Sequence, residues 1–141
     1  MEHEVNVLVL NHGRFGEELI RSAELIVGKT EYAQAVSLVQ GMSIEEFYEE
    51  VKGILETKHG TYIILTDLFG GTPCNVAMML LREFQAHVIC GVNLPMLLEL
   101  IISINNGETR IPHLLKKALG AGKEAIFQPE QIQVNEEILE G

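Results

Sequence analysis

Tryptophan is absent from this 141-residue chain, and cysteine occurs only twice. Cys74 and Cys90 form no CxxC pair, so neither a zinc site nor the disulfide framework of a small secreted domain is expected. The start of the chain, residues 1–4, is acidic and unlike a signal peptide. All apolar runs of the chain are far shorter than the roughly 20 residues that a membrane-spanning helix needs. These absences predict a protein of the reducing cytoplasm.

Basic residues are also scarce: 10 Lys and Arg stand against 20 Asp and Glu, which gives a formal net charge of -10. Such a charge disfavours non-specific binding to nucleic acids and to anionic membranes. All acidic residues except Asp67 are glutamates, and most are expected on solvated helix faces. Asp67 differs from them because it follows directly after a predicted strand.

Short apolar runs alternate along the chain with segments whose apolar residues recur at helical spacing. The predicted strands are residues 5–10, 35–39, 62–66 and 87–90, and the predicted helices are residues 15–27, 43–55, 72–84, 95–104 and 111–119. Nearly continuous apolar strands that alternate with helices are typical of a parallel sheet covered on both faces. We therefore expect an α/β fold with an open, doubly wound, mainly parallel sheet in the strand order 2-1-3-4.

The composition suits one packed domain, because 47% of the residues are hydrophobic and the sequence shows no repeat or linker. We expect residues 1–129 to form this domain and residues 130–141 to form a loose, acidic tail. Gly120 and Gly122 are expected to interrupt the chain after the last helix. Residues 125–127 then predict a short fifth strand at the C-terminal edge.

In a sheet of this kind, ligands bind beyond the carboxyl ends of the strands, where the winding reverses. Here the first predicted strand leads into His12 and the third into Asp67, so both side chains should emerge in one crevice. A carboxylate at one imidazole nitrogen fixes the tautomer and leaves the other nitrogen as a nucleophile. Structural roles stay open, since a histidine after a strand is often a surface residue and an aspartate often accepts N–H groups of its own loop.

Gly70, Gly71 and Thr72 follow Asp67 at the start of a predicted helix. Glycine lets the backbone approach a ligand, and the free N–H groups of a helix start suit an anion such as a phosphoryl group. The Thr72 hydroxyl adds a further donor. Two glycines before a helix are equally typical of a plain turn, and Thr72 of an N-cap. Cys74 has no reactive partner in the sequence, so a packing role is expected for it.

Other phosphate chemistries lack their motifs. GxxxxGK[ST] is missing, as is GxGxxG after the first strand, which excludes a P-loop and disfavours a dinucleotide site. The first strand also does not end in the acidic cluster with which receiver domains bind Mg²⁺. His3, His59, His87 and His113 show no metal-ligand spacing. Transfer of a phosphoryl group to a histidine needs neither metal nor nucleotide, so no cofactor is expected.

Three sequence blocks together resemble the mannose-type IIA components of the bacterial phosphoenolpyruvate-dependent sugar phosphotransferase system. The resemblance covers about residues 4–128, and its blocks are residues 10–28, which include Asn11-His12-Gly13, residues 66–75 and residues 91–97. It implies that His12 accepts a phosphoryl group from the histidine-containing phosphocarrier protein and passes it to a IIB component. Asp67 would orient His12, and Gly71 and Thr72 would hold the phosphoryl group.

The resemblance also implies a homodimer, in some family members with an exchanged C-terminal strand that maps here to about residues 123–128. The membrane permease would be reached only indirectly, through the IIB component. Because the net charge of -10 would not attract a phosphorylated donor, docking should use an apolar patch beside the crevice. Phe69, where family members often carry tryptophan, and Met96 are the candidates for this patch.

Three alternatives stay open. The phosphotransfer subunit of dihydroxyacetone kinases also uses a histidine after the first strand, but a His-Ser pair would favour it over His12-Gly13. Histidine phosphatases and mutases carry Arg-His-Gly at this place, where this chain has Asn11, and four arginines make a thin phosphate clamp. A regulatory domain that keeps the fold without turnover is the non-enzymatic alternative.

Overall fold

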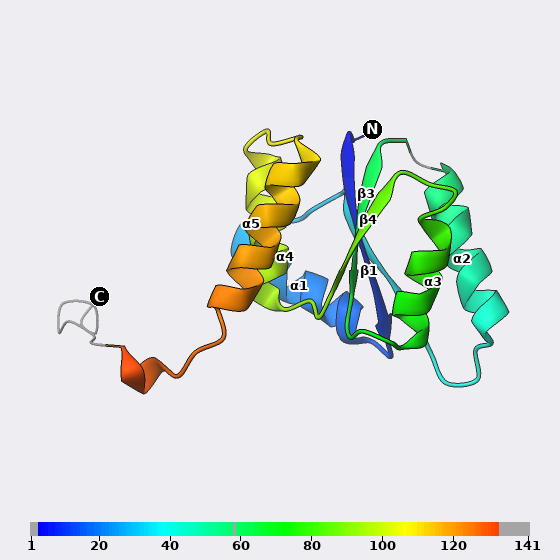
Figure 1. The fold of residues 1–141 in the computed structure, drawn as a ribbon, viewed down its shortest axis with the longest axis horizontal. Coiled ribbons are helices and arrows are strands. Elements are labelled where there is room, and N and C mark those ends of the chain that lie inside the picture. Colours follow the sequence, from blue (N-terminus) through cyan, green and yellow to red (C-terminus); the bar gives the residue numbers. More distant parts are fainter. Residues whose placement is uncertain (1–2, 58, 133–141) are drawn as a thin grey trace.

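The computed structural model describes residues 3–57 and 59–132, which form a four-stranded parallel sheet between two layers of helices (Figure 1). The strands are β1 (Val5–His12), β2 (Ala33–Leu38), β3 (Thr61–Thr66) and β4 (Ala86–Cys90). The helices are α1 (Phe15–Val27), α2 (Ile44–Thr57), α3 (Thr72–Leu80), α4 (Leu94–Asn105) and α5 (Ile111–Glu124), and a short 3-10 turn, η1, follows (Pro129–Gln131). The strand order is β2-β1-β3-β4, so the predicted fold class is confirmed.

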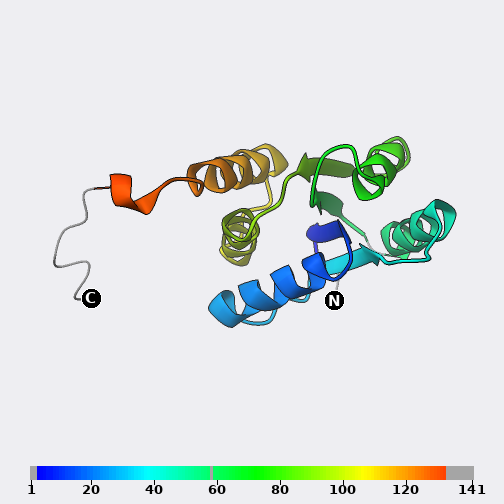
Figure 2. The same cartoon turned by 90° about the horizontal axis from the view of Figure 1, so that it is seen from below.

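The sheet is buried on both faces, as the apolar strands predict. Side chains alternate along a strand, so Val7 and Val9 pack in the layer of α1, α4 and α5, while Leu8 and Leu10 pack in the layer of α2 and α3. Figure 2 shows these two helical layers on opposite sides of the strands. None of the described helices is long and apolar enough to cross a membrane.

The register of the central strands brings the candidate residues to one edge of the sheet. Leu10 of β1 pairs with Thr66 of β3, so His12 and Asp67 lie just beyond this pair on neighbouring strands. The chain leaves β1 for β2 on one side and later returns to β3 on the other. The winding therefore reverses between β1 and β3, at the carboxyl edge of the sheet.

Two helix ends differ from the predicted ones. α3 ends at Leu80 rather than at residue 84, and the N–H of Phe84 closes a turn on the Leu80 carbonyl oxygen. α5 continues through Gly120 and Gly122 to Glu124, so no hinge interrupts it. A Cβ atom at residue 122 would lie 2.8 Å from Cε of Met96. Gly122 therefore serves the close approach of α5 to α4 rather than a turn.

The predicted fifth strand is absent from the described chain. The N–H of Ala125 bonds to the carbonyl oxygen of Ala121 at 3.2 Å and so completes the last turn of α5. The chain then runs away from the sheet toward η1 (Figure 1), with Ile126 78% and Phe127 56% exposed. Most of the predicted acidic tail, residues 133–141, lies outside the described residues.

Candidate functional site

His12 and Asp67 are in direct contact at the carboxyl edge of the sheet. Oδ2 of Asp67 accepts a hydrogen bond from the His12 backbone N–H at 2.8 Å, and it lies 2.8 Å from Nδ1 of the same residue. Oδ1 of Asp67 accepts the N–H of Leu68 at 3.0 Å. The side chain of Asp67 is 11% exposed and that of His12 is 46% exposed. The carboxylate is thus fixed in its loop, while the imidazole is open to solvent.

The end of β1 is shaped by two residues beside the histidine. Gly13 turns the chain at a φ of 60°, and its N–H bonds to the Leu38 carbonyl oxygen at 2.9 Å. Asn11 is fully buried and donates from Nδ2 to the carbonyl oxygen of Gly13 at 2.8 Å. A Cβ atom at residue 16 would lie 2.1 Å from Oδ1 of Asn11, so Gly16 leaves the space that this side chain occupies. Asn11 and Gly16 therefore fix the turn that carries His12.

The backbone at the start of α3 lies against the free edge of the imidazole. A Cβ atom at residue 71 would lie 2.8 Å from Cε1 and 3.4 Å from Nε2 of His12. Gly71 is the N-cap of α3, where the first N–H groups have no partner in a preceding turn. When Asp67 holds a proton on Nδ1, the lone pair of the neutral ring is on Nε2. This nucleophilic nitrogen then lies beside the N-terminus of α3.

Thr72 is the first residue of α3 rather than its N-cap. Within residues 3–57 and 59–132, its hydroxyl makes no hydrogen bond, so it is free to bind an anion at the helix start. Gly70, at a φ of 87°, forms the turn that brings Gly71 toward His12. A Cβ atom built at Gly71 thus lies 3.4 Å from Nε2 of His12, and Thr72 follows Gly71 as the first residue of α3.

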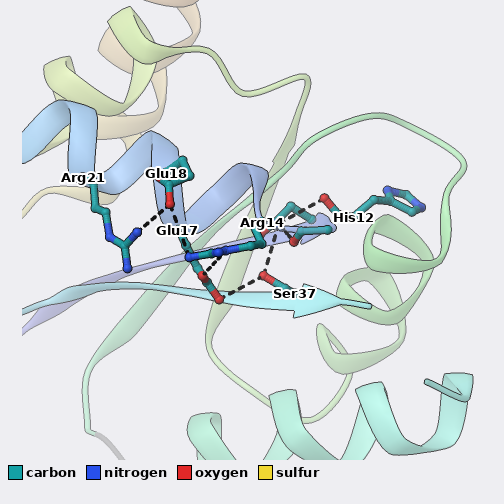
Figure 3. Close-up of polar contacts among 8 residues, drawn as sticks. His12, Arg14, Glu17, Glu18, Arg21 and Ser37 are labelled. Carbon is teal, nitrogen blue, oxygen red and sulfur yellow. Dashed lines mark hydrogen bonds and ion pairs between the residues drawn. The ribbon is translucent and has the colours of Figure 1, made fainter. Parts of the chain in front are cut away.

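A network of exposed ion pairs covers the first turns of α1 beside the site. Arg14 lies 3.5 Å from Glu17 and 3.6 Å from Glu18, and Arg21 pairs with Glu18 as well. Figure 3 shows that the ring of His12 points away from this network, toward α3. Exposed pairs contribute little to stability. Their consequence here is that both arginines are engaged with glutamates and not with the imidazole.

The two candidate docking residues differ sharply in exposure. Phe69 is 82% exposed in the loop between β3 and α3, next to Leu68 at 50%. Met96 is only 4% exposed and packs in the core against α5. Met96 is therefore wrong as a docking residue of this chain, because the same apolar character that made it a candidate buries it between α4 and α5.

Comparisons with known proteins agree with this fold. Residues 6–118 match the family model EIIA-man, described as the PTS system fructose IIA component, where PTS is the phosphotransferase system. The chain therefore belongs to this family of IIA components, and the resemblance noted in the sequence is confirmed.

Individual relatives cover most of the chain. It is 33% identical over 141 residues to the PTS system fructose-specific EIIA component of Bacillus subtilis (strain 168), covering 96% of this chain and 90% of that protein. The mannose/sorbose specific IIA subunit from Enterococcus faecalis has a TM-score of 0.82 at 30% identity, covering 94% of this chain and 98% of that one. The mannose-specific EIIAB component of Escherichia coli (strain K12) is 29% identical over 126 residues, but this chain spans only 38% of its length.

Proposed function

We propose that the protein is a histidine phosphocarrier of the phosphotransferase system. Nε2 of His12 accepts a phosphoryl group from the histidine-containing phosphocarrier protein and passes it to a IIB component for sugar uptake. The observation that carries this proposal is the 2.8 Å contact between Asp67 and Nδ1 of His12, which leaves Nε2 as the nucleophile. Membership of the IIA family supports it.

The transfer is an in-line displacement between two imidazoles. The lone pair of His12 Nε2 forms the new P–N bond while the P–N bond of the donor histidine breaks, and that pair of electrons returns to the donor ring. His12 then carries the phosphoryl group on Nε2 and a proton on Nδ1, so its ring becomes cationic. Asp67 stabilises this charge and holds the ring in line, which is the role of the carboxylate in catalytic triads. The phosphoryl group passes to the IIB component by the same kind of displacement, in which His12 is now the donor. The P–N bond at Nε2 breaks, and its electron pair returns to the His12 ring.

Gly71 and Thr72 form the proposed phosphoryl-binding site. The transition state of phosphoryl transfer is loose and spreads charge over the three equatorial oxygens. The N–H groups and the positive dipole end at the start of α3 can bind these oxygens, together with the Thr72 hydroxyl. The dipole interaction is worth about 0.3–2 kcal/mol. Such a modest stabilisation suits a carrier, since a phosphoryl group that is bound too tightly could not be passed on.

The donor and acceptor dock on an apolar patch beside His12 in this account. We call the exposed side chains at the carboxyl edge of the sheet the rim patch; they are Phe15, Val39, Ile44, Leu68 and Phe69. With a net charge of -10, the chain repels a phosphorylated donor at long range, so apolar contact must supply the docking energy. Both partners dock on the rim patch in turn, in the cytoplasm. The IIB component then links this chain to the membrane permease.

We further propose a homodimer that uses the exposed residues after α5. β4 is an edge strand that pairs only with β3 in the described chain, and an unpaired edge is a template for another strand. Ile126 and Phe127 are exposed and lead away from the sheet, so they can reach the β4 edge of a partner.

Phe127→Asp is expected to yield monomers in light scattering after size-exclusion chromatography. A wild-type protein that is monomeric at all concentrations would contradict the dimer.

Phosphorylation from phosphoenolpyruvate tests the carrier function. The protein is incubated with phosphoenolpyruvate, enzyme I and the phosphocarrier protein, and intact mass is followed. We expect a gain of one phosphoryl group that is labile in acid and stable in alkali. His12→Ala should abolish the gain, while His113→Ala, on the exposed start of α5, should not. Uptake by the His12→Ala variant would overturn the assignment.

A phosphatase is disfavoured by the way in which the arginines of the chain are paired. In the described chain, Arg14 and Arg21 pair with glutamates and Arg110 pairs with Glu108, so none of these three clamps a phosphate at His12. Incubation with phosphate monoesters in the absence of the carrier system separates the two functions. A steady release of inorganic phosphate would favour the phosphatase, and we expect none.

A further inference from the structure

The two cysteines meet at the back of the proposed phosphoryl-binding site. Sγ of Cys74, in the first turn of α3, lies 3.2 Å from Sγ of Cys90, at the end of β4. Both thiols are free in this structure. We infer that Cys74 and Cys90 are a redox-sensitive pair that forms a reversible disulfide and thereby slows phosphoryl transfer at His12.

The geometry requires only a small movement. A disulfide needs a sulfur separation of about 2.05 Å, so the two atoms, now 3.2 Å apart, must approach by about 1.2 Å. The turn after Cys90 is open to one side: Gly91 stands at a φ of 85°, and no atom lies within 4 Å of a Cβ built there. Gly70, in the turn before α3, is equally unobstructed.

The two thiols differ in how accessible they are to solvent. Cys74 is 1% exposed, whereas Cys90 is half-buried, so Cys90 is the thiol that a small oxidant reaches first. Burial raises the pKa of Cys90, a hydrogen bond with Thr66 lowers it, and the nearby Cys74 raises it further. The Thr66 hydroxyl is buried and has no hydrogen-bond partner in the described chain, so it is available to the Cys90 sulfur. The raised pKa keeps more of Cys90 in the less reactive thiol form, so its oxidation should be faster at higher pH.

We name a hydroperoxide as the oxidant. The Cys90 thiolate attacks one peroxide oxygen, the O–O bond breaks, and a sulfenic acid forms while the other oxygen leaves as water after protonation. The Cys74 sulfur then attacks the sulfenic sulfur, the S–S bond forms and a second water leaves. Overall, two thiols are oxidised by two electrons and one hydrogen peroxide is reduced to two waters. A thiol reductant reverses the step by exchange.

The consequence for His12 depends on the proposed function and follows from the position of Cys74. Cys74 lies three residues after Gly71, where a built Cβ atom would lie 2.8 Å from Cε1 of His12. Cys90 pairs in register with Thr66, which directly precedes Asp67. A bond between the sulfurs draws the first turn of α3 toward β4 and shifts the phosphoryl-binding N–H groups relative to Nε2. A misplacement of about 1 Å can cost about a hundredfold in rate, so we expect a loss of about tenfold or more.

Mass spectrometry tests the disulfide without reference to phosphoryl transfer. The reduced, dilute protein is treated with hydrogen peroxide at about pH 7 and about pH 9, where more thiolate is present. We expect a loss of two hydrogens, faster at the higher pH, with Cys74 and Cys90 in one cross-linked peptide and full reversal by dithiothreitol. The exposed Met78 and Met79 are oxidised as well, so Cys90→Ser, which keeps both, is the matched control. Thiols that remain free, or that link only between chains, would overturn the pair.

Transfer kinetics test the regulatory part. The initial rate of phosphoryl uptake is compared for the reduced, oxidised and re-reduced protein. We expect a loss of about tenfold or more on oxidation, full recovery with reductant, and no reductant-reversible loss in Cys90→Ser. A disulfide that forms and leaves the rate unchanged would overturn the proposal that the disulfide slows phosphoryl transfer. Absence of uptake by the reduced protein would instead refute the proposed function and leave the mass result intact.

Discussion

One oxygen of Asp67 binds His12 twice: Oδ2 lies 2.8 Å from the backbone nitrogen and 2.8 Å from ring Nδ1. The first contact fixes the carboxylate relative to the end of β1, and the second fixes the ring relative to the carboxylate. Because both bonds share one oxygen, the ring cannot rotate without losing the second bond. Nε2 is thereby held toward Gly71 and the start of α3.

Asp67→Asn should slow phosphoryl uptake while leaving the fold intact. The amide oxygen can still accept one N–H, but it lacks the charge that stabilises a cationic imidazole. At metal sites, loss of a carboxylate that orients a histidine costs about 10–100-fold, and we expect a loss of at least this size here. Rapid-quench measurement of a single turnover with the phosphorylated carrier gives the rate, and circular dichroism reports the fold. Equal rates for wild type and variant would show that Asp67 does not act on His12.

Gly71→Ala should displace the imidazole. The new Cβ atom would lie 2.8 Å from Cε1 of His12, which is closer than real contacts allow. We expect a loss of about tenfold or more in transfer rate, since the ring must shift out of line. Gly53→Ala on α2 is the control, because nothing lies within 4 Å of its Cβ position. If both variants transfer at the wild-type rate, the ring does not depend on the space at Gly71.

Gly16→Ala should destabilise the fold at the turn after β1. Its Cβ atom would lie 2.1 Å from Oδ1 of the fully buried Asn11, so either the asparagine or α1 must move. Overpacking of this kind costs about 1–3 kcal/mol. Chemical denaturation gives the free energy of unfolding. The same substitution at Gly53 should instead stabilise the protein by about 0.4–1 kcal/mol, so similar values for the two variants would contradict the packing described here.

Tyr32 should resist titration far above the range of an ordinary phenol. Burial raises its pKa to about 12, and its hydroxyl lies 3.1 Å from the Ile101 carbonyl oxygen and 2.6 Å from Oδ1 of Asn105. The folded state holds this proton more tightly than the unfolded state. Its contribution to stability is therefore complete below pH 10 and is lost as the pH rises through about 12.

Absorbance titration of the phenolate checks this behaviour in wild type and Tyr32→Phe. The variant should lose the transition near pH 12 that belongs to Tyr32. It should also unfold more easily at neutral pH by about 1–3 kcal/mol, because it leaves buried acceptors without a donor. Loss of a transition near pH 10 would contradict the buried environment.

The sequence predicted the sheet because each strand is nearly continuous in apolar residues, and the order follows from alternation with helices. It also predicted that His12 and Asp67 emerge at one edge, because that depends on topology alone. The ends of α3 and α5 were missed, since contacts between elements, such as Gly122 against Met96, override the local preference of glycine.

Contacts between side chains that are distant in the sequence could not be predicted from the sequence either. Periodicity shows which face of a helix is apolar, but not how far along a strand the helix sits. The approach of Cys74 to Cys90, sixteen residues apart in the chain, depends on that position. The fit of Gly16 against Asn11 depends likewise on the angle at which α1 leaves β1. An asparagine within an apolar strand was the one available signal for this fit.

Heteronuclear NMR of the phosphorylated protein, labelled with ¹⁵N in its histidines, tests the central claim most directly. The account predicts phosphorus coupling to Nε2 of His12, with a proton retained on Nδ1 next to Asp67. Coupling to Nδ1 of His12, or to a nitrogen of any other histidine, would contradict it.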